Sequence, residues 1–492
     1  MRAIEIHVNR HVFAVIDAQT AVPPVGHLSA PRNRKRKWDT VAGRLATALI
    51  ALCFALAGVL PAHAQSGSVP IVRDAEIEAL LADYAEPILR VAGVKRSRTD
   101  IVLVNQRSFN AFVSGRKIFI NIGAIVQAET PNEIIGVIAH EVGHLAGGHQ
   151  DRLRQQIDRA QTIAAVTAVL GVGAAIAGGL SGNRDAVGAG GGIAMGGAEA
   201  AQRGLLSYRR TEELAADRAA VDYLNRTGQS SKGLLTTFDR FERELSLAGR
   251  QINPYRISHP LPRERRVALE TIAKESPHFN KTDSAALQRR HDRARAKILA
   301  YSYGPGAVES RFRDNPGSQA ARYGKALSTF LNGSPRAAVP IIDQLIAESP
   351  NDPYFHEARG EILLRAQDAQ GAVDSFGRAV RLAGGNAPTM QVALGHALVL
   401  AGGEANLRRA IGELEVAITL DPANPRAYQH LAMAYGRLGA TGEAELATAE
   451  ANFHAGRYEE ARRFAARAKR RFNEGAPQWL RADDIHRFRL PR

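Results

Sequence analysis

Residues 130–150, with the sequence TPNEIIGVIAHEVGHLAGGHQ, constrain the fold of this chain more than any other stretch. Their pattern predicts one helix with its own start and stop. Thr130 can cap the N-terminus, Pro131 suits the first helical position, and Glu133 completes a capping box. Isoleucines and a valine in the middle supply a buried side, and the glycines at 147–148 suit the end.

This helix carries His140 and His144, which are four residues apart. That spacing places two imidazoles on one face, one turn apart. Glu141 lies beside the pair, and H-E-x-x-H on a helix is typical of a zinc site with a general base next to it. Three fixed letters also arise by chance in chains with 15 histidines. The capped amphipathic helix around them favours the zinc site.

Length and composition indicate a globular protein with two or three domains. The chain has 492 residues, of which 45% are hydrophobic and 23% are charged. Its net charge is +15, and residues 1–64 hold eight Lys or Arg and three acidic residues, so about +10 lies beyond them. A basic surface can attract anionic partners. Since no nucleic-acid-binding motif accompanies the charge, we expect a solvated basic surface and no nucleic acid partner.

The first 64 residues are predicted to be a leader with a signal peptide. A basic run at 34–37 precedes an apolar core at about 45–60, and Ala62-His63-Ala64 is an A-x-A cleavage site. The apolar core is short for a membrane span, so we expect cleavage and export rather than a retained anchor. Cys53, the single cysteine, lies in the leader, so the mature chain would have no disulfides.

The segment ahead of the histidine helix predicts one helix and a small amount of β-structure. Residues 74–91 should be helical, and 101–104 should be a strand. Residues 110–113 and 117–121, separated by Ser-Gly, are typical of a hairpin. In a protease, an extended peptide can add to the edge of such a strand, whereas the alternative is a purely structural hairpin.

An insert rich in small residues follows the histidine helix. Residues 151–159 are charged and helical, 162–180 are uncharged, and 181–197 are rich in glycine, which predicts a mobile loop. We interpret 160–200 as a loose helix pair or lid packed near the site. The length of 162–180 just permits a membrane span, but small residues insert weakly, so membrane contact is the alternative.

A second helix, predicted over 205–224, offers carboxylates. Glu213 and Asp217 are four residues apart and share a face. A gluzincin takes its third zinc ligand from a glutamate on a helix downstream of H-E-x-x-H. Glu213 is the candidate, and Asp217 would hold a ligand histidine by its free N–H. A metzincin would need a histidine at position 150, which is Gln150, and His149 lies one residue early, so we expect His149 to be structural.

Three motifs in order carry a resemblance to a known family. His140-Glu-Val-Gly-His144 is followed by Tyr208-x-Arg-x-x-Glu213-x-x-Ala-Asp217 and then by His259-Pro-Leu-Pro-x-x-Arg265. Over about residues 70–275 the chain resembles the HtpX/BepA-type zinc metalloendopeptidases. The resemblance implies one Zn²⁺ per chain, held by His140, His144 and Glu213, with Glu141 as the catalytic acid and base.

His259 lies in a predicted loop, next to a proline. One hypothesis is that it approaches the zinc or a substrate oxyanion and acts as a gate or stabiliser. The other is that His259-Pro260 shapes a turn that Arg265 anchors through a salt bridge. The sequence leaves both open, with a slight preference for the turn.

The C-terminal part changes character after a charged helical linker predicted at 277–318. Prolines at 353, 388 and 422–425 recur at the spacing of a helical repeat, and residues 372–379 match residues 410–417. These features resemble about four tetratricopeptide repeats over 320–470, followed by a tail at 471–492. Stacked repeats of this kind form a solenoid with a concave binding surface. A protease followed by repeats is also the BepA-like arrangement.

The sequence therefore predicts a mainly α-helical chain. It would have a gluzincin domain with a small β-sheet, followed by an α-solenoid. We expect a periplasmic zinc metalloendopeptidase in envelope protein quality control, acting on misfolded or stalled proteins that the repeats recruit. Peripheral membrane association is left open, including at the outer membrane. A chaperone or assembly factor with a structural zinc site is one alternative, and an integral-membrane peptidase is another.

Overall fold

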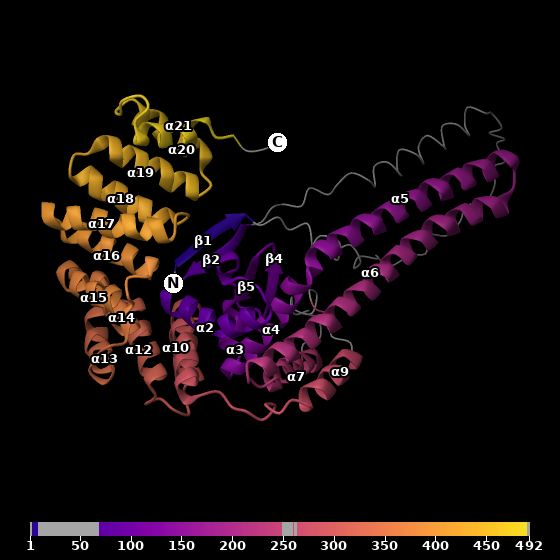
Figure 1. The fold of residues 1–492 in the computed structure, drawn as a ribbon, viewed down its shortest axis with the longest axis horizontal. Coiled ribbons are helices and arrows are strands. Elements are labelled where there is room, and N and C mark those ends of the chain that lie inside the picture. Colours follow the sequence, from indigo (N-terminus) through magenta and orange to yellow (C-terminus); the bar gives the residue numbers. More distant parts are fainter. Residues whose placement is uncertain (1, 8–67, 248–258, 260–262, 490–492) are drawn as a thin grey trace, which may run out of the picture. The chain divides into compact units, whose positions relative to one another are not determined.

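The computed structural model describes residues 2–7, 68–247, 259 and 263–489 (Figure 1). The chain forms two packed units. The first contains residues 1–6, 70–147 and 213–492, and the second contains residues 7–69 and 148–212. The expected signal peptide, with its apolar core at 45–60, lies outside the described residues.

A small mixed sheet lies in the first unit. Its strands are β1 (Arg2–His7), β2 (Ser68–Arg73), β3 (Asp100–Val104), β4 (Ala111–Ser114) and β5 (Lys117–Asn121), in the order β1-β2-β3-β5-β4. β3 pairs with β5 in parallel, while β2 and β4 pair antiparallel to their neighbours β3 and β5. The hairpin expected at 110–121 is confirmed, and its turn uses Gly115 at a positive φ of 60°. β4 ends the described sheet order, so peptide addition there stays a prediction.

The histidine helix is α4 (Pro131–Gly147). Its N-terminus has half of the expected capping box, because the Thr130 amide donates to Glu133 Oε1 at 3.3 Å. The Glu133 carboxylate also accepts from Arg240 at 2.5 Å. At the other end Gly148, with φ of 65°, stops the helix, and the next helix begins at once.

The core around the histidine helix lies between the sheet and its helices. α2 (Ala75–Val91) and α4 pack together and against strands, and α7 (Lys232–Leu247) packs on α4 and on α9 (Arg263–Lys274). The remaining short elements are η1 (Arg96–Arg98) and α3 (Ile122–Gln127). Ile77, Ile120, Ile138 and Phe241 are all fully buried in this core. Each such side chain contributes about 1.5–3 kcal/mol by leaving water, which fixes α4 against the sheet.

The charged segment expected as a linker forms a buried helix. α10 (Ala285–Ser302) packs on α2 and α3 on one side and on the repeats on the other, and α11 (Pro305–Arg311) follows it. Its Lys297 is buried, with Nζ 2.9 Å from Asp74 and 3.5 Å from both Glu76 and Glu357. Arg293 also pairs with Glu76, at 2.9 Å. Charges that are typical of a solvated linker in sequence thus join the helices around the sheet to the repeats.

The repeats are a succession of helix pairs (Figure 1). They are α12 (Gln319–Leu331), α13 (Pro335–Glu348), α14 (Pro353–Arg365), α15 (Ala369–Leu382), α16 (Pro388–Ala401), α17 (Glu404–Leu420), α18 (Pro425–Arg437), α19 (Thr441–His454), α20 (Tyr458–Lys469) and α21 (Pro477–Arg487). Each helix packs on the next one, which is the contact pattern of an α-solenoid. Gly360 and Gly395 take equivalent places, because a Cβ there would lie 2.8 Å from Phe376 and 2.5 Å from Leu414. The segment 471–492, expected as a tail, contains α21, which packs on α20.

The second unit contains two long helices. α5 runs from His149 to Ser181, and α6 starts at Arg184 and runs to Arg226, leaving the unit after Glu212. The expectation of a mobile loop at 181–197 is wrong, because α6 continues through these glycines in close contact with α5. Within the described residues, α5 is long and apolar enough to cross a membrane.

Candidate metal centre

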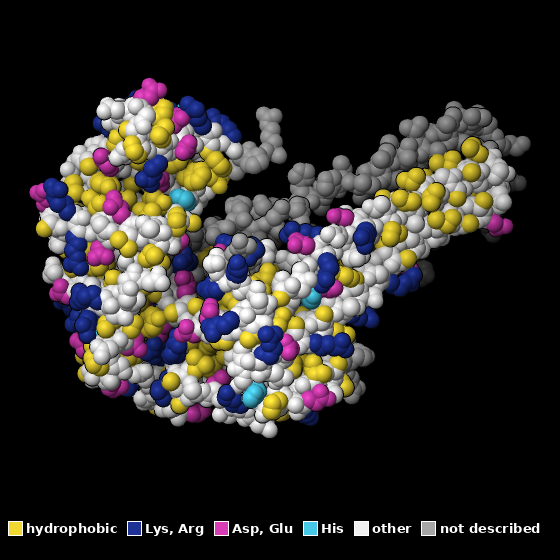
Figure 2. Space-filling view, viewed as in Figure 1, with side chains coloured by type: hydrophobic (Ala, Val, Ile, Leu, Met, Phe, Trp, Pro, Cys, Tyr) yellow, Lys and Arg dark blue, Asp and Glu magenta, His cyan; other side chains and the backbone are white. Residues whose placement is uncertain are grey.

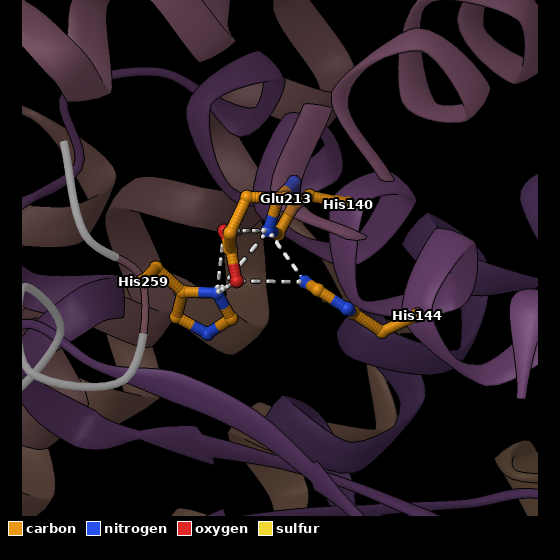
Figure 3. A group of neighbouring side chains, drawn as sticks. All are labelled: His140, His144, Glu213 and His259. Atoms are coloured by element: carbon orange, nitrogen blue, oxygen red, sulfur yellow. Dashed lines mark hydrogen bonds and ion pairs between the residues drawn. The ribbon is translucent and has the colours of Figure 1, made fainter. Parts of the chain in front are cut away.

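Four side chains from three parts of the first unit meet at one point (Figure 3). His140 and His144 come from α4, Glu213 from α6, and His259 from the segment between α7 and α9. One ligand atom from each lies within 4.8 Å of all the others. The structure thus brings together the three ligands expected from sequence and adds the loop histidine to them.

Glycine at position 143 lets the two helices approach. A Cβ built there would lie 3.0 Å from the Ala216 carbonyl oxygen and 3.1 Å from its Cα. Gly143 is the residue before His144, and Ala216 lies one turn after Glu213 on α6. The absence of a side chain at Gly143 therefore sets how closely Glu213 can come to the histidines.

The distances in the cluster fit a tetrahedral cation. Zinc ligands at about 2.05 Å from a tetrahedral ion would be roughly 3.3 Å from one another. His140 Nε2 lies 3.0 Å from His144 Nε2, and each of these two atoms lies 3.4 Å from a Glu213 oxygen. His259 Nδ1 lies 3.3 Å from His140 Nε2 and 3.1 Å from Glu213 Oε1. Imidazole and carboxylate are zinc ligand types, so both the chemistry and the spacing of these residues fit zinc.

Asp217 lies behind His140, as the sequence predicts. Its Oδ1 is 3.0 Å from His140 Nδ1, the ring nitrogen turned away from the cluster. A proton on Nδ1 leaves the Nε2 lone pair directed at the site. The carboxylate therefore fixes both the tautomer and the orientation of the ring.

Arg265 supports the two carboxylates, a contact that the sequence analysis missed. It is 2% exposed, and it donates to Asp217 from Nε at 2.5 Å and from Nη2 at 2.8 Å. Its Nη1 also lies 2.7 Å from Glu213 Oε2. The spacing of His259 and Arg265 was a signal in the sequence, but from it Arg265 was expected to anchor the turn through a salt bridge. The Arg265 guanidinium instead contacts Glu213, a candidate ligand, and Asp217, which lies behind His140.

The carboxylates of the cluster favour a positive charge next to them. Burial lowers the pKa of the His140 imidazole, but the carboxylates of Asp217 and Glu213 outweigh it and raise that pKa to about 9. Burial raises the pKa of Glu213, but His259 and Arg265 more than offset this and hold it well below its usual value. Burial lowers the pKa of both His144 and His259. The lowered pKa of His144 and His259 beside an ionised Glu213 suits a divalent cation, whereas a cation would have to displace the proton that the carboxylates favour on His140.

Glu141 lies at the edge of the cluster. Its Oε1 is buried and has no hydrogen-bond partner among the described residues, and His259 Nε2 lies 3.4 Å from it. Burial raises the pKa of this carboxyl group above its usual value. A buried carboxylate oxygen left without a donor is costly unless a water or substrate group completes it. Glu141 is therefore available for proton transfer.

His149 belongs to a different set of contacts. In the second unit, its Nε2 lies 2.9 Å from Glu212, which also pairs with Arg152 at 2.9 Å. His149 is absent from the four-residue ligand cluster found among the described residues. These contacts agree with the expectation of a structural histidine. They also explain why Glu212, although adjacent to Glu213, faces another way.

Known proteins resemble this chain over the same region. The model of peptidase family M48 matches residues 72–273, which contain His140, His144, Glu213 and His259. The beta-barrel assembly-enhancing protease of Escherichia coli K12 is 22% identical over 346 residues, which cover 68% of each chain. A Vibrio cholerae protein that bears this name provisionally is 24% identical over 306 residues. That alignment spans 60% of the length of the relative.

Solved structures match parts of this chain with low TM-scores. MamA matches with a TM-score of 0.29 and 19% identity, covering 34% of this chain and 95% of MamA. YrrB, a TPR protein, matches with a TM-score of 0.29 and 15% identity, covering 38% of this chain and 94% of YrrB. The family match and the ligand cluster inside it lead to one conclusion: residues 72–273 of this chain are similar to peptidase family M48.

Proposed function

We propose that this protein is a zinc-dependent metalloendopeptidase that cleaves protein substrates. The observation that carries the proposal is the largely buried cluster of His140, His144, Glu213 and His259, whose spacing suits a tetrahedral cation. Beside it lies an oxygen of Glu141 that has no hydrogen-bond partner among the described residues. The match of residues 72–273 to peptidase family M48 and the named activity of the relatives support it.

In this proposal His140, His144 and Glu213 hold the zinc ion. Bound zinc supplies Lewis acidity, which lowers the pKa of water to about 7 and polarises a peptide carbonyl. Glu141 accepts the proton of the attacking water and passes it to the leaving nitrogen. Its raised pKa suits this exchange, because a carboxyl group nearer neutrality is better able to return the proton. Asp217 and Arg265 keep His140 and Glu213 in position.

His259 is proposed to gate the site. Its Nδ1 lies 3.1 Å from both Glu213 oxygens and 3.3 Å from His140 Nε2, so it competes for the position that a water and a substrate carbonyl need. Removing it with His259→Ala should leave zinc bound and raise the rate on a short peptide. A lower rate with zinc retained would indicate the alternative role, stabilisation of the oxyanion.

The biological role is proposed to be protein quality control in the cell envelope. The relatives are named for enhancing beta-barrel assembly, which supports a substrate class of misfolded or stalled envelope proteins. Export to the periplasm through a cleavable signal peptide is part of the proposal, as are recruitment of substrates or partners by α12–α21 and peripheral membrane association. No nucleic acid partner is proposed.

A Glu141→Gln variant tests the catalytic assignment. The amide keeps the size of the side chain but cannot take up the proton, so casein cleavage should fall by about 10²–10⁴-fold. Zinc content should stay at one ion per chain, measured by mass spectrometry of the purified protein. Glu212→Gln is the matched control, because Glu212 is a glutamate next to Glu213 that lies outside the cluster. Unchanged cleavage in Glu141→Gln, or wild-type protein without zinc, would contradict the proposal.

A second candidate function is that of a chaperone or assembly factor. The extent of the repeats, α12 to α21, favours it, because binding surfaces of this size work without catalysis. The same Glu141→Gln variant separates the two in cells. Full envelope integrity and normal protein turnover in that variant would favour the chaperone, whereas loss of both would favour the protease.

A further inference from the structure

The helix pair of the second unit exposes large apolar side chains. Along α5 the exposed fraction is 72% for Val169, 60% for Leu170 and 76% for Leu180, and on α6 it is 70% for Met195. Figure 2 shows hydrophobic side chains gathered over the outer part of α5. Scattered exposed apolar residues are ordinary on a soluble protein, but a continuous apolar surface indicates an interaction site.

Small residues, by contrast, fill the seam between the two helices. A Cβ at Gly171 would lie 2.4 Å from the Gly190 carbonyl oxygen, one at Gly178 would lie 2.7 Å from Ala186 Cβ, and one at Gly197 would lie 2.1 Å from Thr167. Both helices space these glycines seven residues apart, 171 and 178 on α5 and 190 and 197 on α6. The helices therefore touch through their backbones.

This arrangement is the reverse of that found in a stable helix pair in water. A helix pair in water gains stability by burying its Leu, Val and Ile at the seam. Here those side chains point outwards, and the buried contact is made of glycine, alanine and threonine. In lipid there is no hydrophobic drive to hide large side chains, so helices associate through small residues that allow close approach.

The charge pattern agrees with a lipid environment. Within 160–198 the only charged residues are Arg184 and Asp185, which are adjacent at the turn and carry no net charge together. The helical stretch before them, 160–181, rises about 33 Å at 1.5 Å per residue, close to the thickness of a bilayer's hydrocarbon core. The stretch after them, 186–198, rises about 20 Å, which suits insertion better than a full crossing.

The two ends of the hairpin are suited to different surroundings. At the turn, Asn183 Oδ1 accepts from the amides of Asp185 at 3.0 Å and Ala186 at 3.2 Å, which satisfies the backbone at the start of α6. At the other end, arginines occur at 152, 154 and 159 on α5 and at 203 on α6. Exposed arginines there complement anionic lipid headgroups.

We propose that residues 160–202 insert into a lipid bilayer as a helical hairpin, turn first, with these arginines at the headgroups. The occupant of the apolar surface is the acyl phase rather than a second copy of the chain or a protein substrate. The inference does not rest on the zinc chemistry. A protein without peptidase activity would still insert, and the two proposals therefore fail separately.

Vesicle flotation of the purified, exported chain provides the test. With vesicles of phosphatidylethanolamine and phosphatidylglycerol, the wild type should float, and Val169→Glu/Leu180→Glu should reduce the bound fraction at least tenfold. The matched control is Val416→Glu/Leu480→Glu, which changes residues of the repeats that are 46% and 50% exposed, and it should float like the wild type. Both double variants should keep zinc and casein cleavage, which checks that they fold.

A fluorescent label reports insertion directly. Leu180→Cys and Leu480→Cys are made in a Cys53→Ser background, which removes the natural cysteine, and each is labelled with an environment-sensitive dye. Emission at position 180 should rise several-fold on adding vesicles, with no change at 480. Failure of the wild type to float, or flotation without a change at 180, would overturn the proposal. High, concentration-dependent emission at 180 before lipid is added would assign the surface to a second copy and also overturn it.

Discussion

Two buried charged clusters in the first unit differ in what their charged groups surround. The cluster at α10 surrounds Lys297, whose ammonium lies 2.9 Å from Asp74 and 3.5 Å from Glu76 and Glu357. The cluster at α4 directs imidazole nitrogens and a carboxylate at one another, with Nε2 of His140 and Nε2 of His144 3.0 Å apart. The first contains its own central cation, whereas the second groups cation ligands around one point.

The difference shows how a stabilising ionic cluster can be told from a binding site. Burial of charge is common to both, and so are strong shifts in pKa. In the Lys297 cluster the carboxylates converge on a cation of the chain itself. In the metal centre the arginine lies behind the ligands, contacting Glu213 and Asp217 from outside, and leaves the converging atoms to an ion. Substitutions should therefore separate the two by their effects on metal and on stability.

Removal of the ligand histidines should have the largest effect. A His140→Ala/His144→Ala double variant loses two of the expected ligands, so zinc should be absent and casein cleavage should fall to background. Zinc analysis of the purified protein measures the first, and the wild type treated with a chelator should reproduce the second. Zinc content equal to that of the wild type would contradict the site assignment.

Lys297→Met should destabilise the chain strongly without affecting zinc. It leaves buried carboxylates without their ammonium, and breaking a buried ion pair from one side costs about 3–5 kcal/mol. The free energy of unfolding in urea measures the loss, and zinc per folded chain should be unchanged. Lys325→Met, at an exposed position of α12, is the control and should lie within about 0.5 kcal/mol of the wild type. A loss of zinc in the Lys297 variant would mean that the two clusters are not independent.

Asp217→Asn should weaken zinc binding without abolishing it. The amide no longer accepts as strongly from His140 Nδ1, and the loss of such a partner behind a ligand typically reduces metal affinity about 10–100-fold. Competition with a chromogenic chelator measures the affinity, and activity should recover at excess zinc. Asp222→Asn, an exposed position on the same helix, serves for comparison. Equal affinity in both variants would show that Asp217 does not support the ligand.

Glu357→Gln should have the smallest effect, which is a change in how the free energy of unfolding depends on pH. Burial raises the pKa of Glu357 to about 8, in spite of Lys297 nearby. Because this folded pKa exceeds the ordinary value of 4.5, the folded state holds a proton that the unfolded state has lost. The contribution of Glu357 to stability is therefore full below about pH 4.5 and declines as pH rises towards 8.

The variant removes this decline. Relative to the wild type, Glu357→Gln should gain on the order of 1 kcal/mol in free energy of unfolding between pH 5 and pH 8, as expected for a shift shared with neighbouring groups. Denaturant unfolding at a series of pH values checks the slope. Glu474→Gln, at an exposed position near the C-terminus, should leave the slope unchanged. An identical slope in all three proteins would contradict the raised pKa.

Some of the fold could be predicted because its signals are local. The helix at 131–147 follows from a cap, a helical period and terminal glycines, and the hairpin at 111–121 follows from strand residues around a Ser-Gly turn. The helical repeats follow from recurring prolines and small residues. The glycines at 181–197 wrongly predict a loop, because glycine weakens a helix in water. The pairing of α5 with α6 through those glycines overrides this propensity.

In the candidate site, too, some features follow from local sequence and others depend on tertiary packing. The sequence alone determined that His140 and His144 share a face, since residues four apart on a helix must, and it offered Glu213 with Asp217 on a second helix. Only the tertiary structure decided that His259, 119 residues from His140, lies in the same cluster, and that Arg265, 48 residues from Asp217, holds the carboxylates. The physical reason is that such contacts depend on where separate elements pack, and no local spacing encodes that.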